Sequence, residues 1–222
     1  MFYPELPGMS PSVVVHLPHA STTLPLDLSP PLSLTPLEID AELLAMTDRY
    51  TDELFALPAA LATTVRFPVS RLVVDPERFP DDALEVMAAG GMGVVYTRTS
   101  DGRPLRPIPT LAERAALLAR FYEPHHRALT AAVAEALSAR GRCLVLDGHS
   151  FPSRPLPYEL DQRDARPDVC IGTDAFHTPS WLRELATAAF ERADFSVAVD
   201  RPFAGALVPA AYYAGEVRVA AL

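Results

Sequence analysis

The sequence contains no lysine and no asparagine, and its 222 residues include only two cysteines, Cys143 and Cys170. The absence of lysine excludes Schiff-base chemistry and a lysine general base, and it makes every permanent side-chain cation an arginine. Arginine is suited to carboxylates, because its guanidinium forms paired hydrogen bonds with them. The cysteines form no Cys-x-x-Cys pair, so zinc-ribbon chemistry is not indicated, and both lie in apolar stretches typical of buried thiols.

Positive charge and long apolar runs are also scarce. Arginines number 19 against 28 acidic residues, a net charge of −9, which argues against a nucleic-acid partner because that class needs a basic surface. No apolar run approaches the roughly 20 residues that span a bilayer. Residues 1–7 lack the basic and apolar regions of a signal peptide. We therefore expect a cytoplasmic protein with neither a nucleic-acid nor a membrane partner.

The composition that remains is that of a globular enzyme-sized domain. Hydrophobic residues make up 49% of the chain, and 222 residues are enough for a substantial core. The 23 prolines are scattered through loops rather than gathered in a linker. No internal repeat or compositional break divides the chain, so we predict a single domain over residues 1–222.

Apolar periodicity predicts alternating strands and helices. Thr35 and Thr110 each begin a capping box, and Pro124 interrupts the second helix. The predicted helices span residues 36–57, 111–140 and 180–192. The predicted strands span residues 12–17, 63–67, 71–74, 93–97, 143–146, 168–172, 195–199 and 216–222. This alternation indicates an α/β fold with a mostly parallel sheet and helices on both faces.

Polar side chains follow two of these strands where each strand ends. His149 comes directly after Asp147 and Gly148, and His19 follows the first strand. Since the carboxyl ends of parallel strands meet along one edge, the two imidazoles can converge, and Asp48 from the first helix would complete a His-Asp-His set. Three protein ligands plus water is the arrangement of catalytic zinc sites. The alternative interpretation is a pair of ordinary polar turns, because no His-x-x-His helix supports a metal site.

Two arginines, Arg71 and Arg78, flank Asp75 in a short segment. One interpretation is a plain surface ion network. The other is an anion clamp, in which one guanidinium faces a developing oxyanion and the other binds a substrate carboxylate. His16 lies within the first strand on the side of Val14 and is predicted to be a core histidine, and His177 to be structural or exposed.

Taken together, the segments resemble the N-formylglutamate amidohydrolase family. The matching motifs run in order along the chain and cover residues 13–21, 47–55, 69–79, 93–98, 122–126, 146–151, 167–174, 177–179 and 201–205. The resemblance implies a three-layer α/β/α fold like that of zinc carboxypeptidases. It also implies a metal-dependent hydrolase that cleaves N-formyl-L-glutamate to formate and L-glutamate, a step of histidine degradation.

The resemblance also implies roles for individual residues. His19 and His149 look like ligands of Zn²⁺ or another divalent metal, with Asp48 as the acidic third and Asp52 as its fallback. The broader superfamily, which includes the aspartoacylases, has a His-x-x-Glu pair, but here Thr22 stands three residues after His19. The acidic ligand is therefore expected from elsewhere in the chain.

By the same similarity, Arg71 would polarise the scissile carbonyl and Arg78 would hold a substrate carboxylate, assisted by Arg98 or His126. Glu77 stands where the superfamily has an asparagine. The family continues into a Gln-Ile-Glu strand whose glutamate is similar to the general base, and this sequence stops at Leu222, which we interpret as a truncation. Hydrolysis of another N-acyl amino acid, or metal binding without turnover, are the alternatives.

Overall fold

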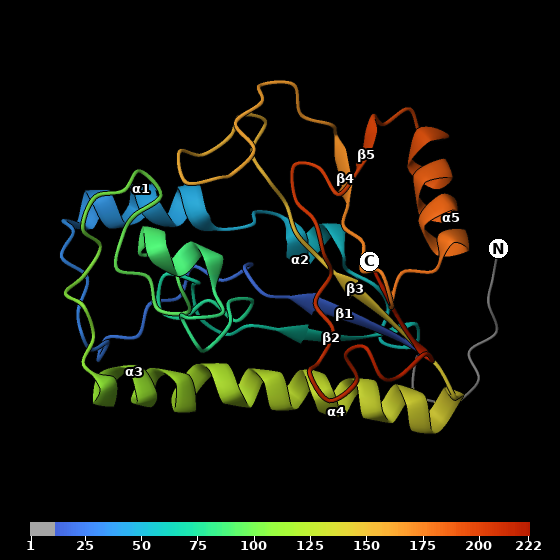
Figure 1. Ribbon diagram of the computed structural model, residues 1–222, viewed down its shortest axis with the longest axis horizontal. Helices are drawn as coiled ribbons and strands as arrows, with labels where there is room; N and C mark the ends of the chain where they lie inside the picture. Colours follow the sequence, from blue (N-terminus) through green and yellow to red (C-terminus); the bar gives the residue numbers. More distant parts are fainter. Residues whose placement is uncertain (1–11) are drawn as a thin grey trace.

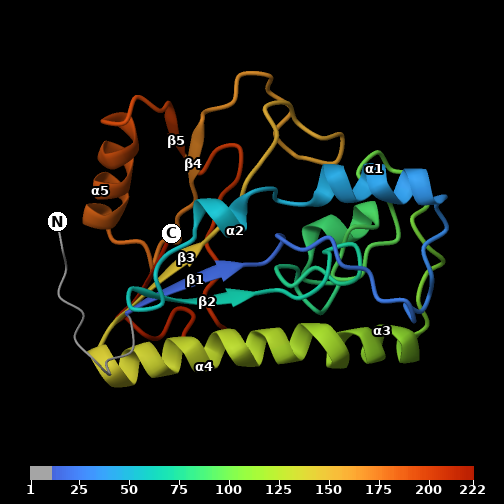
Figure 2. The same cartoon turned by 180° about the vertical axis from the view of Figure 1, so that it is seen from behind.

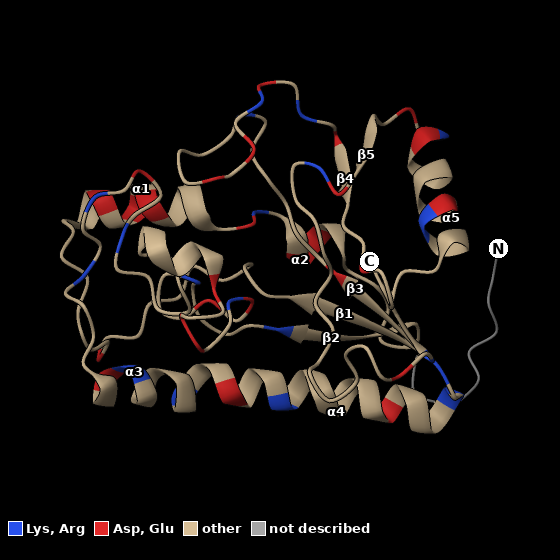
Figure 3. Ribbon diagram, in the orientation of Figure 1, with Lys and Arg blue, Asp and Glu red and all other residues tan. Residues whose placement is uncertain are grey.

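The computed structural model describes residues 12–222, so residues 1–7, in which the sequence predicts no signal peptide, lie outside the described part. A four-stranded sheet forms its centre (Figure 1), in the order β2-β1-β3-β6 with every neighbouring pair parallel. Its strands are β1 (Val13–Leu17), β2 (Ala62–Arg66), β3 (Cys143–Asp147) and β6 (Val219–Ala221). In Figure 3 these strands carry charged residues only near their ends. The mostly parallel α/β fold expected from the sequence is confirmed.

Helices cover both faces of the sheet. Helix α4 (Glu123–Arg140) packs Leu129 and Val133 against Val14 and Val145 on one face. On the other side of the sheet lie α1 (Pro36–Met46) and α2 (Thr51–Leu54), as Figures 1 and 2 show from opposite directions. The residue after α2, Phe55, packs against Val15 and Leu17 of β1. The result is three layers, with the sheet in the middle.

A second, smaller parallel sheet pairs β4 (Val169–Ile171) with β5 (Val197–Val199). Helix α5 (Ser180–Glu191) connects these two strands and packs on them. In Figure 1 this unit lies on the α1–α2 side of the central sheet. Residues 152–168 form a long segment without regular structure between β3 and β4.

Proline interrupts the long helix as expected. Helix α3 (Leu111–Leu117) passes into one π-helical turn (Leu118–Tyr122) before α4 begins. The N–H of Glu123 donates to the carbonyl oxygen of Leu118, five residues back. Because Pro124 has no N–H to donate, the wider turn changes the hydrogen-bond register just before it, and the helix continues in nearly the same direction.

The helix predicted over residues 36–57 is wrong in its second half. It ends at Met46, where Thr47 is extended, and Tyr50 then adopts a left-handed conformation with φ of 65° before the short α2. Asp48 therefore lies in a loop and not on a helix face. Its N–H donates to the carbonyl oxygen of His19 at 3.1 Å, a tertiary contact that competes with continuation of the helix.

The strands predicted at residues 71–74 and 93–97 are also wrong. Both segments form turns and irregular backbone, although Leu72, Val73 and Val74 are completely buried. A backbone hydrogen bond from the Asp75 N–H, just after the first segment, to the Val94 carbonyl oxygen at 2.8 Å links the two. A loop that is buried on all sides has the same continuous apolar sequence as a central strand, so the sequence pattern does not distinguish the two. A 3-10 helix (Val86–Gly90) lies between the two segments.

None of the helices between residues 12 and 222 combines the length and the apolar character that crossing a membrane requires.

Candidate metal centre

The carboxyl ends of β1 and β3 bring two histidines together, as the parallel topology predicts. His19 and His149 each lie two residues beyond a strand, and their ring centroids are 5.3 Å apart. The N–H of Gly148 donates to the carbonyl oxygen of His16 at 2.8 Å, which extends the pairing of the two strands up to the histidines. The juxtaposition is thus a direct consequence of strand register.

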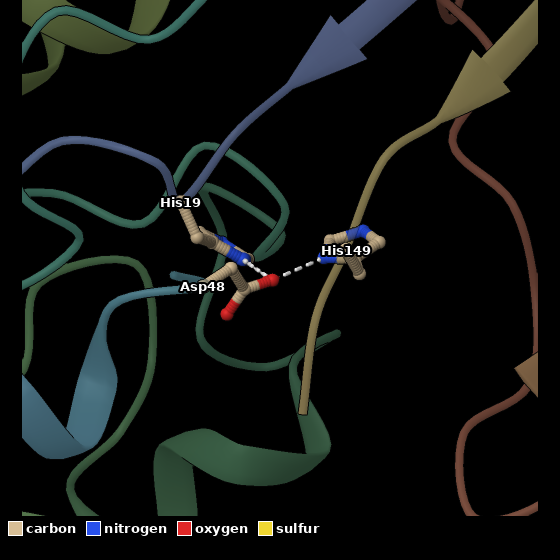
Figure 4. A group of neighbouring side chains, drawn as sticks. All are labelled: His19, Asp48 and His149. Atoms are coloured by element: carbon tan, nitrogen blue, oxygen red, sulfur yellow. Dashed lines mark hydrogen bonds and ion pairs between the residues drawn. The ribbon is translucent and has the colours of Figure 1, made fainter. Parts of the chain in front are cut away.

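Asp48 joins the two histidines from the loop after α1 (Figure 4). Its Oδ2 lies 2.8 Å from His149 Nδ1 and 3.7 Å from His19 Nδ1. One ligand atom from each of the three residues falls within 4.8 Å of the others. The structure therefore assembles the three residues expected from the sequence, whereas the fallback Asp52 is exposed and lies 3.6 Å from Arg66.

The donor set fits a divalent metal. His19 Nε2–H donates to Asp75 Oδ1 at 2.9 Å, so the neutral ring carries its lone pair on Nδ1. That Nδ1 is buried and has no hydrogen-bond partner among the described residues. Ligand atoms around tetrahedral zinc lie about 3.3 Å apart, given bonds of roughly 2.0–2.1 Å. The spacings of 2.8 and 3.7 Å from Asp48 fall on either side of that value, so small shifts would admit an ion.

Electrostatics in the cluster favour positive charge between its carboxylates. Burial opposes ionisation of Asp48, but the hydrogen bond from His149 and the nearby His19 ring outweigh it and hold the pKa of Asp48 well below its usual range. Burial and Arg71 lower the pKa of His19, but Asp75 and Glu77 reverse the effect, and its pKa is raised. A bound cation would supply the charge that these protons otherwise provide.

Asp75 is the buried anchor behind the site. It is completely inaccessible, and it accepts hydrogen bonds from His19, from Arg71 Nη2 at 2.7 Å and from the Tyr96 hydroxyl. Burial opposes its charge, but Arg71 and His19 hold the pKa of Asp75 well below its usual range. A carboxylate that holds the outer nitrogen of a ligating histidine is a recurrent feature of metal centres.

Arg71 is fixed by the same anchor and directs one edge toward the cluster. Its Nε and Nη2 donate to Asp75, while Nη1 lies 3.9 Å from Asp48 Oδ1. Burial disfavours the guanidinium charge, but Asp75 and Tyr96 raise the pKa of Arg71 well above its ordinary value. Arg71 is thus a permanent cation whose Nη1 faces the histidine-bearing edge.

Arg78 lies nearby and keeps donors free. Its Nε is 3.6 Å from Asp75 Oδ2 and has no hydrogen-bond partner among the described residues, and its Nη1 is 3.6 Å from Glu85. His126 approaches the same segment from α4, donating from Nε2 to the Pro76 carbonyl oxygen at 2.8 Å. Tyr122 stacks on His126 at 4.1 Å and donates to the Arg78 carbonyl oxygen.

Arg98 is placed elsewhere. Its side chain is exposed, and Nη1 donates to the Gly102 carbonyl oxygen at 3.0 Å within the adjacent turn. It packs against Gly91. The role of Arg98 in substrate binding stays a prediction from the resemblance.

Sequence reasoning missed three side chains at this site. Glu77 Oε1 lies 3.2 Å from His149 Nε2, and its other oxygen lies 3.6 Å from His19. Asp147 Oδ1 lies 3.5 Å from His149 Nε2. The sequence offers an indication for two of them. Asp147 ends the central strand, where site residues are expected, and Glu77 lies two residues after Asp75. The buried Tyr96 had none, because a tyrosine in an apolar run is indistinguishable from core.

His16 is the core histidine that the sequence predicts. It is fully buried, donates from Nδ1 to Asp147 Oδ1 at 2.7 Å and contacts His125 Nε2 at 2.8 Å through its other nitrogen. Burial, with His16 adding to it, lowers the pKa of His125 to about 3. His177 is also structural: its Nδ1 donates to the Val219 carbonyl oxygen, and its Nε2 accepts from Ala214.

The fold and the cluster define an α/β protein with a histidine–carboxylate centre at the carboxyl edge of its sheet. Residues 11–222 match the N-formylglutamate amidohydrolase family, and the chain belongs to that family. It is 30% identical over 167 residues to the N-formylglutamate deformylase of Pseudomonas aeruginosa, an alignment that covers 73% of this chain. The chain spans 59% of the length of that curated relative.

Two solved structures share the fold. The crystal structure of N-formylglutamate amidohydrolase from Ralstonia eutropha JMP134 superposes with a TM-score of 0.82 at 23% identity, over 97% of this chain and 81% of that one. A gene product of Agrobacterium tumefaciens gives a TM-score of 0.66 at 24% identity, over 88% of this chain and 71% of that one. At these identities the similarity establishes the architecture.

Proposed function

We propose that this protein is a metal-dependent amidohydrolase that cleaves N-formyl-L-glutamate to formate and L-glutamate, as a step of histidine degradation in the cytoplasm. One observation carries the proposal: His19, Asp48 and His149 offer ligand atoms within 4.8 Å of one another. Family membership supports the reaction type, and the name of the Pseudomonas aeruginosa relative supports the substrate.

In this proposal the three residues hold Zn²⁺ or another divalent ion. Such an ion, once bound, lowers the pKa of water to about 7 and polarises a carbonyl group. Asp75 keeps the His19 ring oriented with Nδ1 toward the cluster, because it accepts the hydrogen bond from Nε2. The histidine loops thus form a site whose outer hydrogen bonds are already in place.

The arginines divide the remaining work. Arg71 is immobilised by Asp75 and directs Nη1 toward the cluster, where it would stabilise negative charge developing on the amide oxygen. Among the described residues, Arg78 Nε has no hydrogen-bond partner and the ion pairs of Arg78 are long, so it retains donors for a substrate carboxylate. His126 contacts the same segment and is its proposed assistant, with Arg98 as the alternative.

The proposed partner is therefore a small molecule that carries carboxylates, and no role for nucleic acid or membrane is proposed. The overall acidic charge does not oppose an anionic substrate, because nearby arginines dominate the potential inside a site. Substrates with another acyl group on the same amino acid would use the same contacts.

The test uses the native protein with whatever sequence follows Leu222 in it, stripped of metal with a chelator and then loaded with Zn²⁺. Formate release from N-formyl-L-glutamate is measured enzymatically, with N-acetyl- and N-succinyl-L-glutamate assayed by glutamate release. The proposal expects turnover of the formyl substrate that disappears on chelation and returns with metal. Preference for another acyl group would reassign the substrate. Stoichiometric metal binding without any turnover would contradict the proposed activity and indicate a metal-binding protein that is not an enzyme.

A further inference from the structure

His149 has a carboxylate partner at each of its ring nitrogens. Its Nδ1 lies 2.8 Å from Asp48 Oδ2, within the histidine–carboxylate cluster (Figure 4), and its Nε2 lies 3.2 Å from Glu77 Oε1. A neutral imidazole that binds a metal through Nδ1 carries its proton on Nε2, and that N–H is usually held by a carboxylate, a carbonyl group or water. Glu77 therefore lies where the outer nitrogen of a metal-bound His149 would donate.

The position of Glu77 is fixed by the two residues before it. The backbone N–H of Glu77 donates to Asp75 Oδ1 at 3.0 Å, and the same oxygen accepts from His19 Nε2. A side-chain oxygen that binds the N–H two residues on forms an Asx turn. Pro76 lies between them with its φ restricted by the ring, and its carbonyl oxygen accepts from His126 Nε2 at 2.8 Å. Three hydrogen bonds thus hold this turn in place.

The turn offers one carboxylate to each candidate histidine ligand. Asp75 holds His19 and is completely buried, whereas Glu77 faces His149 and its side chain is 19% exposed. The second oxygen of Glu77 lies 3.6 Å from His19 Nε2. In the described part of the chain Glu77 forms ion pairs with these two histidines alone, so no arginine neutralises its charge.

Asp147 is the other carboxylate near this nitrogen, with Oδ1 at 3.5 Å from His149 Nε2. Both of its oxygens already accept shorter hydrogen bonds. Oδ1 accepts from His16 Nδ1 at 2.7 Å, and Oδ2 accepts from the Leu207 N–H at 2.7 Å. Glu77 is nearer to His149 and is not held by other donors in this way, so the geometry favours it as the acceptor.

We infer that Glu77 is a positioning residue: its carboxylate accepts the Nε2 hydrogen bond of His149 and thereby orients Nδ1 toward the metal, as Asp75 does for His19. The inference rests on the proposed function, because it requires His149 to be a metal ligand. A carboxylate in this place also makes the ring more basic and thus a stronger ligand. One turn then orients both histidine ligands.

Zinc affinity provides the first test, measured without substrate on the metal-free native protein by competition with a chromophoric chelator. Glu77→Ala should lower the affinity about 10- to 100-fold. Glu77→Gln keeps an acceptor oxygen but loses the charge, so it should lose less than Glu77→Ala does. Because Glu77 is partly exposed, both variants should keep the circular dichroism spectrum of the parent protein.

Glu53→Ala is the matched control for the affinity measurement. Glu53 is an exposed glutamate of α2, so the substitution removes the same charge from the protein without touching either histidine. Zinc affinity should equal that of the parent protein. An equal loss in Glu53→Ala and Glu77→Ala would reduce the effect to overall charge and would overturn the assignment.

The second test is NMR of the zinc-loaded protein with ¹⁵N-labelled histidine. Long-range ¹H–¹⁵N correlations should show that His149 binds zinc through Nδ1 and is protonated at Nε2. In Glu77→Ala the exchange of this Nε2 proton with water should accelerate about tenfold, the loss of one hydrogen bond, and Glu77→Gln should restore protection. The Nε2 proton of His19, which Asp75 holds, should be unaffected, whereas general loosening of the site would change both rings.

Three results would overturn the positioning role while leaving the proposed reaction intact. They are unchanged zinc affinity in Glu77→Ala, a His149 Nε2 proton that stays protected in that variant, which would assign the acceptor to Asp147, and zinc bound through Nε2 of His149. Zinc binding that depends on Glu77 without formate release would support the role and contradict the proposed activity. A parent protein that binds no zinc would overturn both.

Discussion

His19 and Asp75, which are 56 residues apart in sequence, share a 2.9 Å hydrogen bond between Nε2 and Oδ1 in the interior of the protein. The same carboxylate binds Arg71, so one buried anion orients both a candidate metal ligand and a candidate electrophile. The precision of the candidate centre thus depends on a residue that touches neither substrate nor metal in the proposed arrangement.

Asp75→Asn tests this dependence. The amide keeps the shape but removes the charge opposite Arg71, which leaves a buried guanidinium unpaired. We expect the free energy of unfolding to fall by about 3–5 kcal/mol, measured by urea denaturation with a chelator present so that metal does not contribute. Zinc affinity of the folded variant should fall roughly 10- to 100-fold.

The control for that variant is Asp27→Asn. Asp27 pairs with Arg120 at 2.9 Å on the exposed surface, so its loss should leave the urea midpoint unchanged. Equal destabilisation by the two substitutions would contradict the special position assigned to Asp75.

His149→Ala tests the metal centre itself. The His149 side chain is 36% exposed, so its removal should cost little packing, and the circular dichroism spectrum should be preserved. Zinc retained after dialysis, measured by atomic absorption, should drop from one equivalent to none, and formate release should be lost. Ser150→Ala is the neighbouring control, because the backbone N–H of Ser150 would still contact Asp48. Full activity in His149→Ala would refute the ligand assignment.

The two arginines should separate in steady-state kinetics. Arg78→Ala should raise KM for N-formyl-L-glutamate roughly 10- to 150-fold, the loss of about 1.5–3 kcal/mol of charge-assisted hydrogen bonding, with kcat little changed. Arg71→Ala should instead lower kcat about 10²- to 10³-fold. Arg127→Ala removes an exposed arginine of α4 and should change neither parameter. The opposite pattern for Arg71 and Arg78 would exchange their roles.

The same assay decides which side chain assists Arg78. His126→Gln should raise KM, because His126 contacts the segment that carries Arg78, whereas Arg98→Gln should do so only if Arg98 leaves its turn. If the two variants and the unmodified protein have equal KM values, neither His126 nor Arg98 contacts the substrate.

The sheet and the two candidate histidine ligands could be predicted from the sequence because they follow from local rules, whereas Asp48, also named as a ligand, was placed on the wrong kind of element. Val14 and Val145 belong to apolar runs that read as buried strands, and parallel pairing fixes where each run ends. His19 and His149 then meet without any further information. The histidine pair is therefore a consequence of topology that a sequence can reveal.

Contacts between distant loops could not be predicted in this way. Asp48 was expected on a helix, but its N–H binds the His19 carbonyl oxygen and places it in a loop. Glu77 and Tyr96 meet the site through irregular segments whose apolar runs resemble strands. Apolar periodicity in a sequence predicts which residues are buried, but it does not predict which buried loops contact each other.

Gly148, between Asp147 and His149, lies where the ends of β1 and β3 approach each other closely. A Cβ at this position would lie 2.7 Å from Leu17 Cδ2, closer than real contacts allow, and 3.0 Å from the Phe55 ring, which is tighter than most real contacts. Gly148→Ala should therefore push the ends of β1 and β3 apart. We expect a loss of about 1–3 kcal/mol in unfolding free energy and weaker zinc binding, because His19 and His149 move with those ends.

A double-mutant cycle isolates that contact. Leu17→Val removes the Cδ2 atom that the new methyl group would meet, so the stability losses of Gly148→Ala and Leu17→Val should be less than additive. Gly215→Ala is the control, since a Cβ there meets only the Tyr213 carbonyl oxygen at 3.8 Å, and it should leave zinc affinity unchanged. Strict additivity, or normal zinc binding in Gly148→Ala, would show that the spacing of these two strand ends does not set the metal centre.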